Sequence, residues 1–587
     1  MDKRMLMIFA LTFLILLLFQ PLLTKYWNKQ APASPVPPQQ AATLAPAAPA
    51  AVRPPAPASG VKAAATASET VVENGLYRIT FSNQGAQVKS WVLKKYTDEK
   101  GAPLELINKG AQVEVQQNGQ TVFQPAVERY GYPMSLWTYD EGLRNKLNSV
   151  LYVASATGHL EAPADLSFEY ADHDLVVRKK FHFDPASYVV HIQTEVANKG
   201  QFIQAYPAWP AGFGDQTIVT AYATGRIDYD FGDKVTRLEG KKVSGGNTLY
   251  GPFNWGGAVD QYFGAIFLPD QPQEAAMITL HSMALIPKDP NKPDLKETTQ
   301  VSLLGAAVGN RNGPTGGRWF VGPKAVDVID AIHSSPAPGQ SAGPTLGSMI
   351  DFGFFGWVGK PLFLWLKWTQ QHWVSNWGWA IAVLTIIINL ALLPLRISSM
   401  KSALKMQKVQ PLVNDIKKKY EKLPMKDPRK AEMNREVSAV FKEHGVNPVG
   451  GCLPMVIQLP FLWAFYTMLS AAIELRHAPW LWIKDLWAPD PYHILPIAIV
   501  VSTWGMQKMT PSPGMDATQA RMMNLMMPVM LGIFSWAVAA GLGIYWLLGT
   551  VIFMVTQLAL NRTGLGQEMH TIAEKRAHRK ASRAEKR

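Results

Sequence analysis

Polar side chains interrupt apolar stretches in the last third of the chain, and they are the groups best placed there to bind another molecule. Thr385 and Asn389 are four residues apart, so they share one face of a helix. Arg396 lies seven residues after Asn389, near the same face. Gln458 and Tyr545 interrupt two other apolar runs. Polar groups are costly inside a bilayer unless they face protein or water. The pattern therefore indicates either hydrogen bonding between helices or a water-accessible groove.

Apolar runs of bilayer length carry these side chains. The N-terminal run, Met5–Leu23, would reach roughly 28 Å as a helix, which is the thickness of a hydrocarbon core. Five more runs follow in the second half of the chain: Trp377–Leu395, Cys452–Leu475, Ile494–Met509, Met526–Ala540 and Leu542–Leu560. Only Gly541 separates the last two, which predicts a tight hairpin. We therefore expect a polytopic α-helical membrane protein with six spans.

The distribution of Lys and Arg predicts the topology. Residues 396–450 contain 13 Lys and Arg against 6 Asp and Glu, whereas the segment between the third and fourth runs contains only Arg476 and Lys484. Cytoplasmic loops are enriched in Lys and Arg. We expect an inner-membrane protein with both termini in the cytoplasm, the tail 563–587 included. Residues 1–28 favour an uncleaved signal anchor over a cleaved signal peptide, because residues 20–25 form a poor cleavage site.

The region between the first and second runs has two parts. Residues 29–69 are rich in Ala and Pro and predict an extended linker. Residues 70–345 show short alternating strands separated by turns, as at 76–81, 175–183 and 188–196, and predict a large antiparallel β-sandwich outside the cytoplasm. Three histidines lie nine residues apart in it, but they only weakly suggest a metal site because the sequence shows no carboxylate partner: His173, His182 and His191.

Two amphipathic segments flank the second run. Residues 347–376 are rich in aromatic residues and predict a helix at the membrane interface, or a helix packed under the β domain. Residues 397–445 predict a cytoplasmic helical hairpin within the block 377–562. Its methionines could contact varied apolar partners or pack within the hairpin: Met400, Met406, Met425 and Met433.

The C-terminal motifs resemble the YidC/Oxa/Alb family of membrane protein insertases, in the Gram-negative form that has a large periplasmic β-supersandwich. The matching stretches are VNPVGGCLPMVIQLPFLWAFYTML (Val446–Leu469), GLGIYWLLGTVIFMVTQLALNR (Gly541–Arg562), DFGFFGWVGKPLF (Asp351–Phe363) and NWGWAIAVLTIIIN (Asn376–Asn389). The resemblance covers nearly the whole chain, is highly specific over 347–562, and is absent in the linker.

The resemblance implies a chaperone-like insertase that is not an enzyme and uses no cofactor. It implies a hydrophilic groove open to the cytoplasm and to lipid. Nascent membrane proteins would enter that groove, with or without the Sec translocon (SecYEG and SecDF). It also suggests that the basic tail contacts the ribosome and that lipids surround the spans.

One position departs from the family pattern. The family places a groove arginine five residues before a proline, and counting back from Pro394 gives Asn389. Thr385 matches a groove threonine, and Tyr545 with Trp546 falls where the family often has a tyrosine pair. Arg396 is a candidate substitute, but we expect its side chain to extend outward to the cytoplasm. The groove would then rely less on attraction of acidic substrate segments.

Two other classes of protein compete with the insertase. A small-molecule transporter is disfavoured because the spans show no inverted repeat and no proton-relay carboxylate. A membrane-anchored periplasmic carbohydrate-binding or envelope protein would instead place its function in residues 70–345. Deletion of about residues 70–320 would discriminate, because an insertase should largely keep its activity.

Overall fold

The structure is a computed structural model that describes most of the chain after residue 59. The described residues are 60–117, 119–214, 224–232, 234–288, 297–335, 342–420, 423, 427–446, 453–509, 517–564, 567 and 571, with the backbone alone at 403, 453–459 and 517–521. The predicted first span, most of the linker, Met425 and most of the basic tail lie outside these residues.

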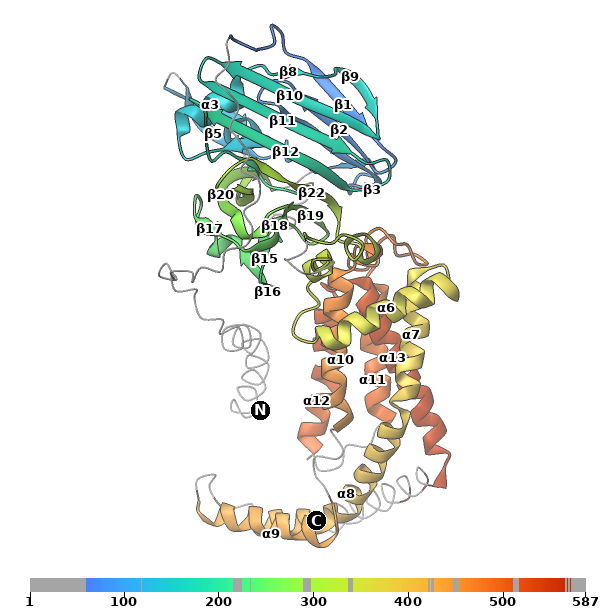
Figure 1. Cartoon of the computed structure of the whole chain (residues 1–587). Helices are drawn as coiled ribbons and strands as arrows, with labels where there is room; N and C mark the ends of the chain where they lie inside the picture. Colours follow the sequence, from blue (N-terminus) through green and yellow to red (C-terminus); the bar gives the residue numbers. More distant parts are fainter. Residues whose placement is uncertain are drawn as a thin grey trace. The chain divides into compact units, whose positions relative to one another are not determined.

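Within the described residues, the strands form three sheets (Figure 1). The first has the order β4 (Pro103–Glu105), β3 (Gln87–Thr97), β2 (Tyr77–Ser82), β1 (Glu69–Glu73) and β9 (Gly158–Glu161). The second has the order β16 (Lys234–Glu239), β15 (Arg226–Phe231), β18 (Phe253–Val259), β19 (Phe263–Pro269), β22 (Thr315–Pro323), β12 (Val189–Asn198), β11 (Leu175–Phe183), β10 (Ala164–Asp172) and β8 (Val153–Ala154), with β13 (Gln201–Phe202) beside β12. The third has the order β6 (Gln120–Pro125), β5 (Gln112–Gln117), β20 (Ala275–Pro287), β21 (Thr298–Asn310), β14 (Tyr206–Trp209) and β7 (Ser135–Trp137), with β17 (Thr248–Tyr250) beside β20.

Four short helices connect these strands and a fifth follows the last strand: α2 (Ala126–Tyr130), α3 (Glu141–Ser149), η1 (Gly240–Lys242), η2 (Pro272–Glu274) and, after β22, α5 (Val326–Ile329). The strands and these helices together are called the β domain below. The strands expected at 76–81, 175–183 and 188–196 are confirmed as β2, β11 and β12.

Aromatic side chains from different sheets meet in the core of the β domain. The ring of Phe81 on β2 lies 5.0 Å from that of Phe181 on β11 and 5.9 Å from that of Phe183. The expected antiparallel arrangement is wrong at one place, because β1 pairs in parallel with β9. These two strands are far apart in the chain, so no tight turn forces them to run in opposite directions.

The β domain also buries a lysine. Lys179 on β11 is 1% exposed, and its Nζ donates hydrogen bonds to the carbonyls of Gly85, Ala86 and Met134 at 2.8, 3.0 and 2.8 Å. These three bonds use every N–H of the ammonium group. Burial lowers the pKa of Lys179 to about 7.

The second half of the chain is helical. Its elements are η3 (Leu346–Met349), α6 (Gly356–His372), α7 (Trp377–Ala391), α8 (Leu393–Lys419), α9 (Arg429–Glu443), α10 (Leu453–Ala471), η4 (Ile473–Leu475), α11 (Ile494–Met509), α12 (Ala517–Ser535) and α13 (Ala540–Asn561). In Figure 1, α6 runs across the direction of the neighbouring helices. Among the described residues, α13 alone is long and apolar enough by itself to cross a bilayer, and α7 with α8 meets the same criterion as a pair bent by 46°. The six spans are therefore not confirmed.

Three expected boundaries are wrong. The amphipathic helix is shorter than residues 347–376, because η3 and a non-helical stretch precede α6. The first hairpin helix begins at Leu393, immediately after α7, so the hairpin has no separate start. Gly541 is not a turn, because it lies inside α13 and its N–H donates to Leu486 O at 2.8 Å. The turn after α12 is formed by residues 536–539 instead.

The end of α10 and the segment that follows it contact the β domain. Ile473 belongs to the same buried apolar cluster as Phe81 and Trp91. Gln261 Nε2 donates to Ser470 O at 2.9 Å, and the guanidinium of Arg476 lies 3.7 Å from Glu99. The helical region thus supplies part of the β-domain core.

Candidate functional site: buried polar groups at the α7–α8 bend

A continuous set of hydrogen bonds crosses the bend between α7 and α8. Thr385 Oγ1 donates to Ile381 O at 2.7 Å, and Asn389 Nδ2 donates to Thr385 O at 2.7 Å. Arg396 Nη2 then donates to Asn389 Oδ1 at 2.6 Å. Thr385 and Asn389 are 0% and 5% exposed. We call Thr385, Asn389 and Arg396 the bend cluster.

The expectation that Arg396 extends outward is wrong. Side chains on a helix point toward its N-terminus, and Arg396 lies in the first turn of α8. Its guanidinium is therefore directed back toward α7. Its Nη1 atom is buried and has no hydrogen-bond partner among the described residues.

Helix α13 forms the wall opposite the bend cluster. The guanidinium of Arg396 lies 5.0 Å from the centre of the Phe553 ring. Gly549 faces Asn389, because a Cβ on it would lie 3.9 Å from Asn389 Nδ2. Tyr545 is one turn before Gly549 and is 4% exposed, with its ring stacked 4.3 Å from that of Phe465. Trp546 is half-buried and its ring lies 6.3 Å from that of Phe534.

Sequence reasoning missed several buried polar side chains on α11 and α13. They are Ser502, Thr503 and Gln507 on α11, with Thr550 and Gln557 on α13. Neither Thr503 Oγ1 nor the amide of Gln507 has a hydrogen-bond partner among the described residues. The spacing of four between Thr503 and Gln507, and of seven between Thr550 and Gln557, was the available signal. Unpaired polar groups between helices suit a water-containing space.

The other predicted site residues are placed differently. Met400 is buried with Leu404 against Leu560, and Met406 packs beside Val409 and Val413. These positions favour packing within the protein for Met400 and Met406. Met433 on α9 is half-buried. The side chain of Gln458 lies outside the described residues, as does Met425.

The β-domain histidines do have carboxylate partners, contrary to expectation. His182 Nδ1 lies 2.7 Å from Asp165, and His191 Nε2 lies 3.5 Å from Asp184. His173 Nδ1 lies 2.8 Å from Asp172. Strand pairing places Asp165 opposite His182, which the sequence does not reveal, whereas Asp172 directly precedes His173 in the sequence. In the described part of the chain, no group of three or more His, Cys, Asp or Glu is arranged to hold a metal ion.

Two family models match this chain and divide it between them. The model described as 60Kd inner membrane protein matches residues 368–567. The model described as YidC periplasmic domain matches residues 69–366. The β domain therefore matches a periplasmic domain, and the helical region from residue 368 onward matches an inner-membrane protein.

Curated relatives narrow this class to one family. The membrane protein insertase YidC of Geobacter sulfurreducens is 33% identical over an alignment of 502 positions, which covers 83% of this chain and 85% of that protein. The membrane protein insertase YidC of Syntrophus aciditrophicus is 30% identical over an alignment of 602 positions, which covers 96% of this chain and 100% of that protein. This chain belongs to the YidC family of membrane protein insertases.

A solved structure also matches the chain. It is a crystal structure of an active YidC insertase with the first transmembrane domain resolved. The match has a TM-score of 0.34 and 18% sequence identity, and it covers 87% of this chain and 95% of that chain.

Proposed function

We propose that this insertase moves segments of membrane proteins from the cytoplasm into lipid through a hydrophilic groove built around the bend cluster. The observation that carries the proposal is the hydrogen bond from Arg396 Nη2 to Asn389 Oδ1. This bond holds the positively charged guanidinium of Arg396 next to Asn389, which is itself neutral. A guanidinium with an unused N–H can bind the carboxylate of an acidic substrate segment.

The apolar part of the substrate would then move along α10 and α13. Both helices expose apolar side chains, among them Trp463 and Tyr466 on α10 and Val555 and Leu558 on α13. The stack of Tyr545 on Phe465 joins the two helices beside the bend cluster. A substrate leaving the polar groups would meet this apolar surface next.

We further propose six spans with both termini in the cytoplasm. The spans would be Met5–Leu23, α7, α10, α11, α12 and α13. Helix α11 has 16 residues, or roughly 24 Å, a length that a slightly thinned bilayer accommodates. The excess of Lys and Arg in residues 396–450 supports the placement of α8 and α9 in the cytoplasm.

The proposed partners follow from the family and from charge. Nascent membrane proteins are the substrates, and this insertase would insert them either by itself or together with the Sec translocon. The basic tail would contact ribosomal RNA phosphates in a salt-dependent way, and lipids would cover the exposed apolar helix faces. The proposed mechanism involves no catalytic residue and no cofactor.

Insertion into liposomes tests the role of Arg396. A single-span substrate with an acidic flank is presented to proteoliposomes that contain the full-length protein, and the protease-protected fraction is measured. Arg396→Ala should lower the insertion rate about tenfold, the effect of losing one charge-assisted hydrogen bond. Arg396→Lys should restore part of the rate.

Lys401→Ala is the matched control, because Lys401 is an exposed cation of the same helix, five residues further on. That variant should insert the substrate at the wild-type rate. Equal rates for wild type and Arg396→Ala would exclude the guanidinium from the groove. No protected substrate above empty liposomes, even with wild type, would exclude insertion by this protein alone.

A further inference from the structure

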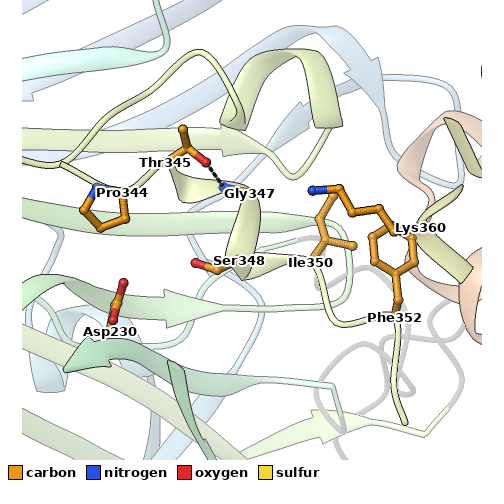
Figure 2. Close-up of a pocket in the computed structure, with 8 residues that line it drawn as sticks. All are labelled: Asp230, Pro344, Thr345, Gly347, Ser348, Ile350, Phe352 and Lys360. Carbon is orange, nitrogen blue, oxygen red and sulfur yellow. Dashed lines mark hydrogen bonds between the residues drawn. The ribbon is translucent and has the colours of Figure 1, made fainter. Parts of the chain in front are cut away.

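A partly open pocket lies where the β domain meets the segment that leads into α6 (Figure 2). Its volume is about 410 Å³, within the range of small-molecule sites. The lining residues are Asp230, Pro344, Thr345, Gly347, Ser348, Ile350, Phe352 and Lys360. None of these residues belongs to the bend cluster, and the proposed groove does not include them.

The two charged groups of the pocket have opposite sign. Asp230 comes from β15 and is 2% exposed, whereas Lys360 comes from α6 and is exposed. Figure 2 shows the amino group of Lys360 directed toward Ser348 and Gly347, with the Asp230 carboxylate on the far side of Ser348. Ile350 and Phe352 form an apolar side next to Lys360. A ligand that fills this space would meet a cation at one end and an anion at the other.

Arg237 holds one wall of the pocket, and further ion pairs lie close by. Arg237 Nη2 donates to Ser348 O at 2.9 Å, and its Nε lies 3.5 Å from Asp351. Arg226 Nη2 pairs with Asp228 at 3.1 Å. The hydroxyl of Thr345 accepts from Gly347 N at 3.3 Å. The segment around Ser348 is therefore held in place from the β-domain side.

The position of α6 indicates which molecules reach the pocket. Phe354, Trp357, Trp365 and Trp368 are exposed on or beside this helix, at 63%, 75%, 41% and 42%. Exposed aromatic side chains with an adjacent lysine are typical of helices at the membrane–water interface. Lys360 would thus lie at the depth of the phospholipid head groups on the periplasmic side.

We propose that this pocket binds the head group of a phosphatidylethanolamine molecule. The phosphate would accept hydrogen bonds from Lys360 Nζ and the Ser348 hydroxyl, and the ammonium would donate to the Asp230 carboxylate. Phosphatidylglycerol offers no cation for Asp230. Phosphatidylcholine has a quaternary ammonium without N–H donors, so it cannot form the hydrogen bonds to the carboxylate. The acyl chains would lie beside the exposed aromatic side chains of α6.

Native mass spectrometry of the full-length protein in detergent tests this assignment. The protein is titrated with phosphatidylethanolamine, phosphatidylcholine and phosphatidylglycerol of identical acyl chains. We expect phosphatidylethanolamine to bind about tenfold more tightly than either other lipid, the effect of one charge-assisted hydrogen bond. Asp230→Asn should remove this preference, whereas Lys360→Gln and Ser348→Ala should weaken the binding of all three lipids, because all three carry the phosphate.

Lys484→Gln is the matched control, since Lys484 is an exposed lysine between α10 and α11 that does not line the pocket. It should keep the preference. Circular dichroism checks that Asp230→Asn is folded, and Lys360→Gln tests the site without a buried substitution. Equal affinity for the three lipids overturns the proposal, as does tighter binding of phosphatidylglycerol. Free phosphoethanolamine that binds as tightly as the lipid would support the head-group chemistry and overturn the lipid as its source.

Discussion

Lys179 in the β domain and Arg396 in the helical region are both cations withdrawn from water, and their hydrogen bonding differs. The ammonium of Lys179 donates to three backbone carbonyls, which uses all its N–H groups. The guanidinium of Arg396 donates to Asn389 through Nη2, while Nη1 is buried without a hydrogen-bond partner among the described residues. Lys179 therefore has no N–H group left for another acceptor, whereas Arg396 still has N–H groups that could donate to one.

This difference separates a structural cation from one that can bind a ligand. Lys179 joins two segments of the β domain, near residues 85 and 134, and has nothing left to offer a second molecule. Arg396 is held by one neighbour and by the face of Phe553, so a substrate carboxylate could complete its hydrogen bonding. A buried polar group that lacks a partner costs free energy, and such a cost is common at functional sites.

The largest effect is expected for Lys179→Met. Three buried carbonyls lose their donor, which should lower the free energy of unfolding of the β domain by about 3–5 kcal/mol. Hydrogen exchange of β2 and β11 in the full-length protein measures this. Lys180→Met changes the exposed neighbour and should leave exchange unchanged. A loss below about 1 kcal/mol for Lys179→Met would remove the contrast between the two cations.

The next effect concerns the partner of Arg396. Asn389→Asp should lower insertion of acidic-flanked substrates about tenfold, because the new carboxylate pairs with Arg396 and repels the substrate. Asn389→Ala should lower it about threefold, since Arg396 loses its anchor but keeps its charge. Liposome insertion with acidic and neutral flanks, run in parallel, measures both. If insertion of the neutral-flanked substrate fell by the same factor, the variants would have disturbed the packing of the helices and not the charge of the groove.

The pH dependence of β-domain stability gives a smaller effect. Burial lowers the pKa of Lys179 to about 7 and that of Lys324 to about 8, from the ordinary 10.5. Between these folded values and 10.5 the unfolded chain binds more protons, so stability should rise with pH. We expect a gain of about 1 kcal/mol or more from pH 7 to pH 8, measured by denaturant unfolding at each pH. A flat profile would contradict the burial of both amines.

The smallest effect is expected for Tyr545→Phe. Its ring stacks on Phe465 within an apolar cluster, so Tyr545 belongs with the structural groups despite its place beside the bend cluster. Insertion should change by less than about twofold, whereas Tyr545→Ala should lose the stack and lower both stability and insertion. A large loss in the phenylalanine variant would assign the hydroxyl to the groove.

Local patterns predicted part of this molecule. Helix α11 has the bounds that its apolar run indicated, and alternation located β2, β11 and β12. Residue spacing placed Arg396 near the same helix face as Asn389, but the long arginine side chain was expected to extend toward the cytoplasm, so their hydrogen bond was not predicted. The burial of Lys179 did have a signal, since Val177, Lys179 and Phe181 alternate onto one strand face. Its carbonyl partners come from distant turns, which only the fold brings together.

The place of Ile473 in the β-domain core has a consequence for how the chain can be divided. The periplasmic-domain model ends at residue 366 and the inner-membrane model begins at residue 368. Ile473 and the half-buried Trp487 lie in the second of these regions, yet they pack into the apolar core of the β domain. We therefore expect the stability of the β domain to depend on residues that lie beyond this boundary. A periplasmic fragment that ends at this boundary would expose the apolar surface that Ile473 covers in the full chain. Adding residues 472–488 as a separate peptide should cover that surface and raise the melting temperature of the fragment.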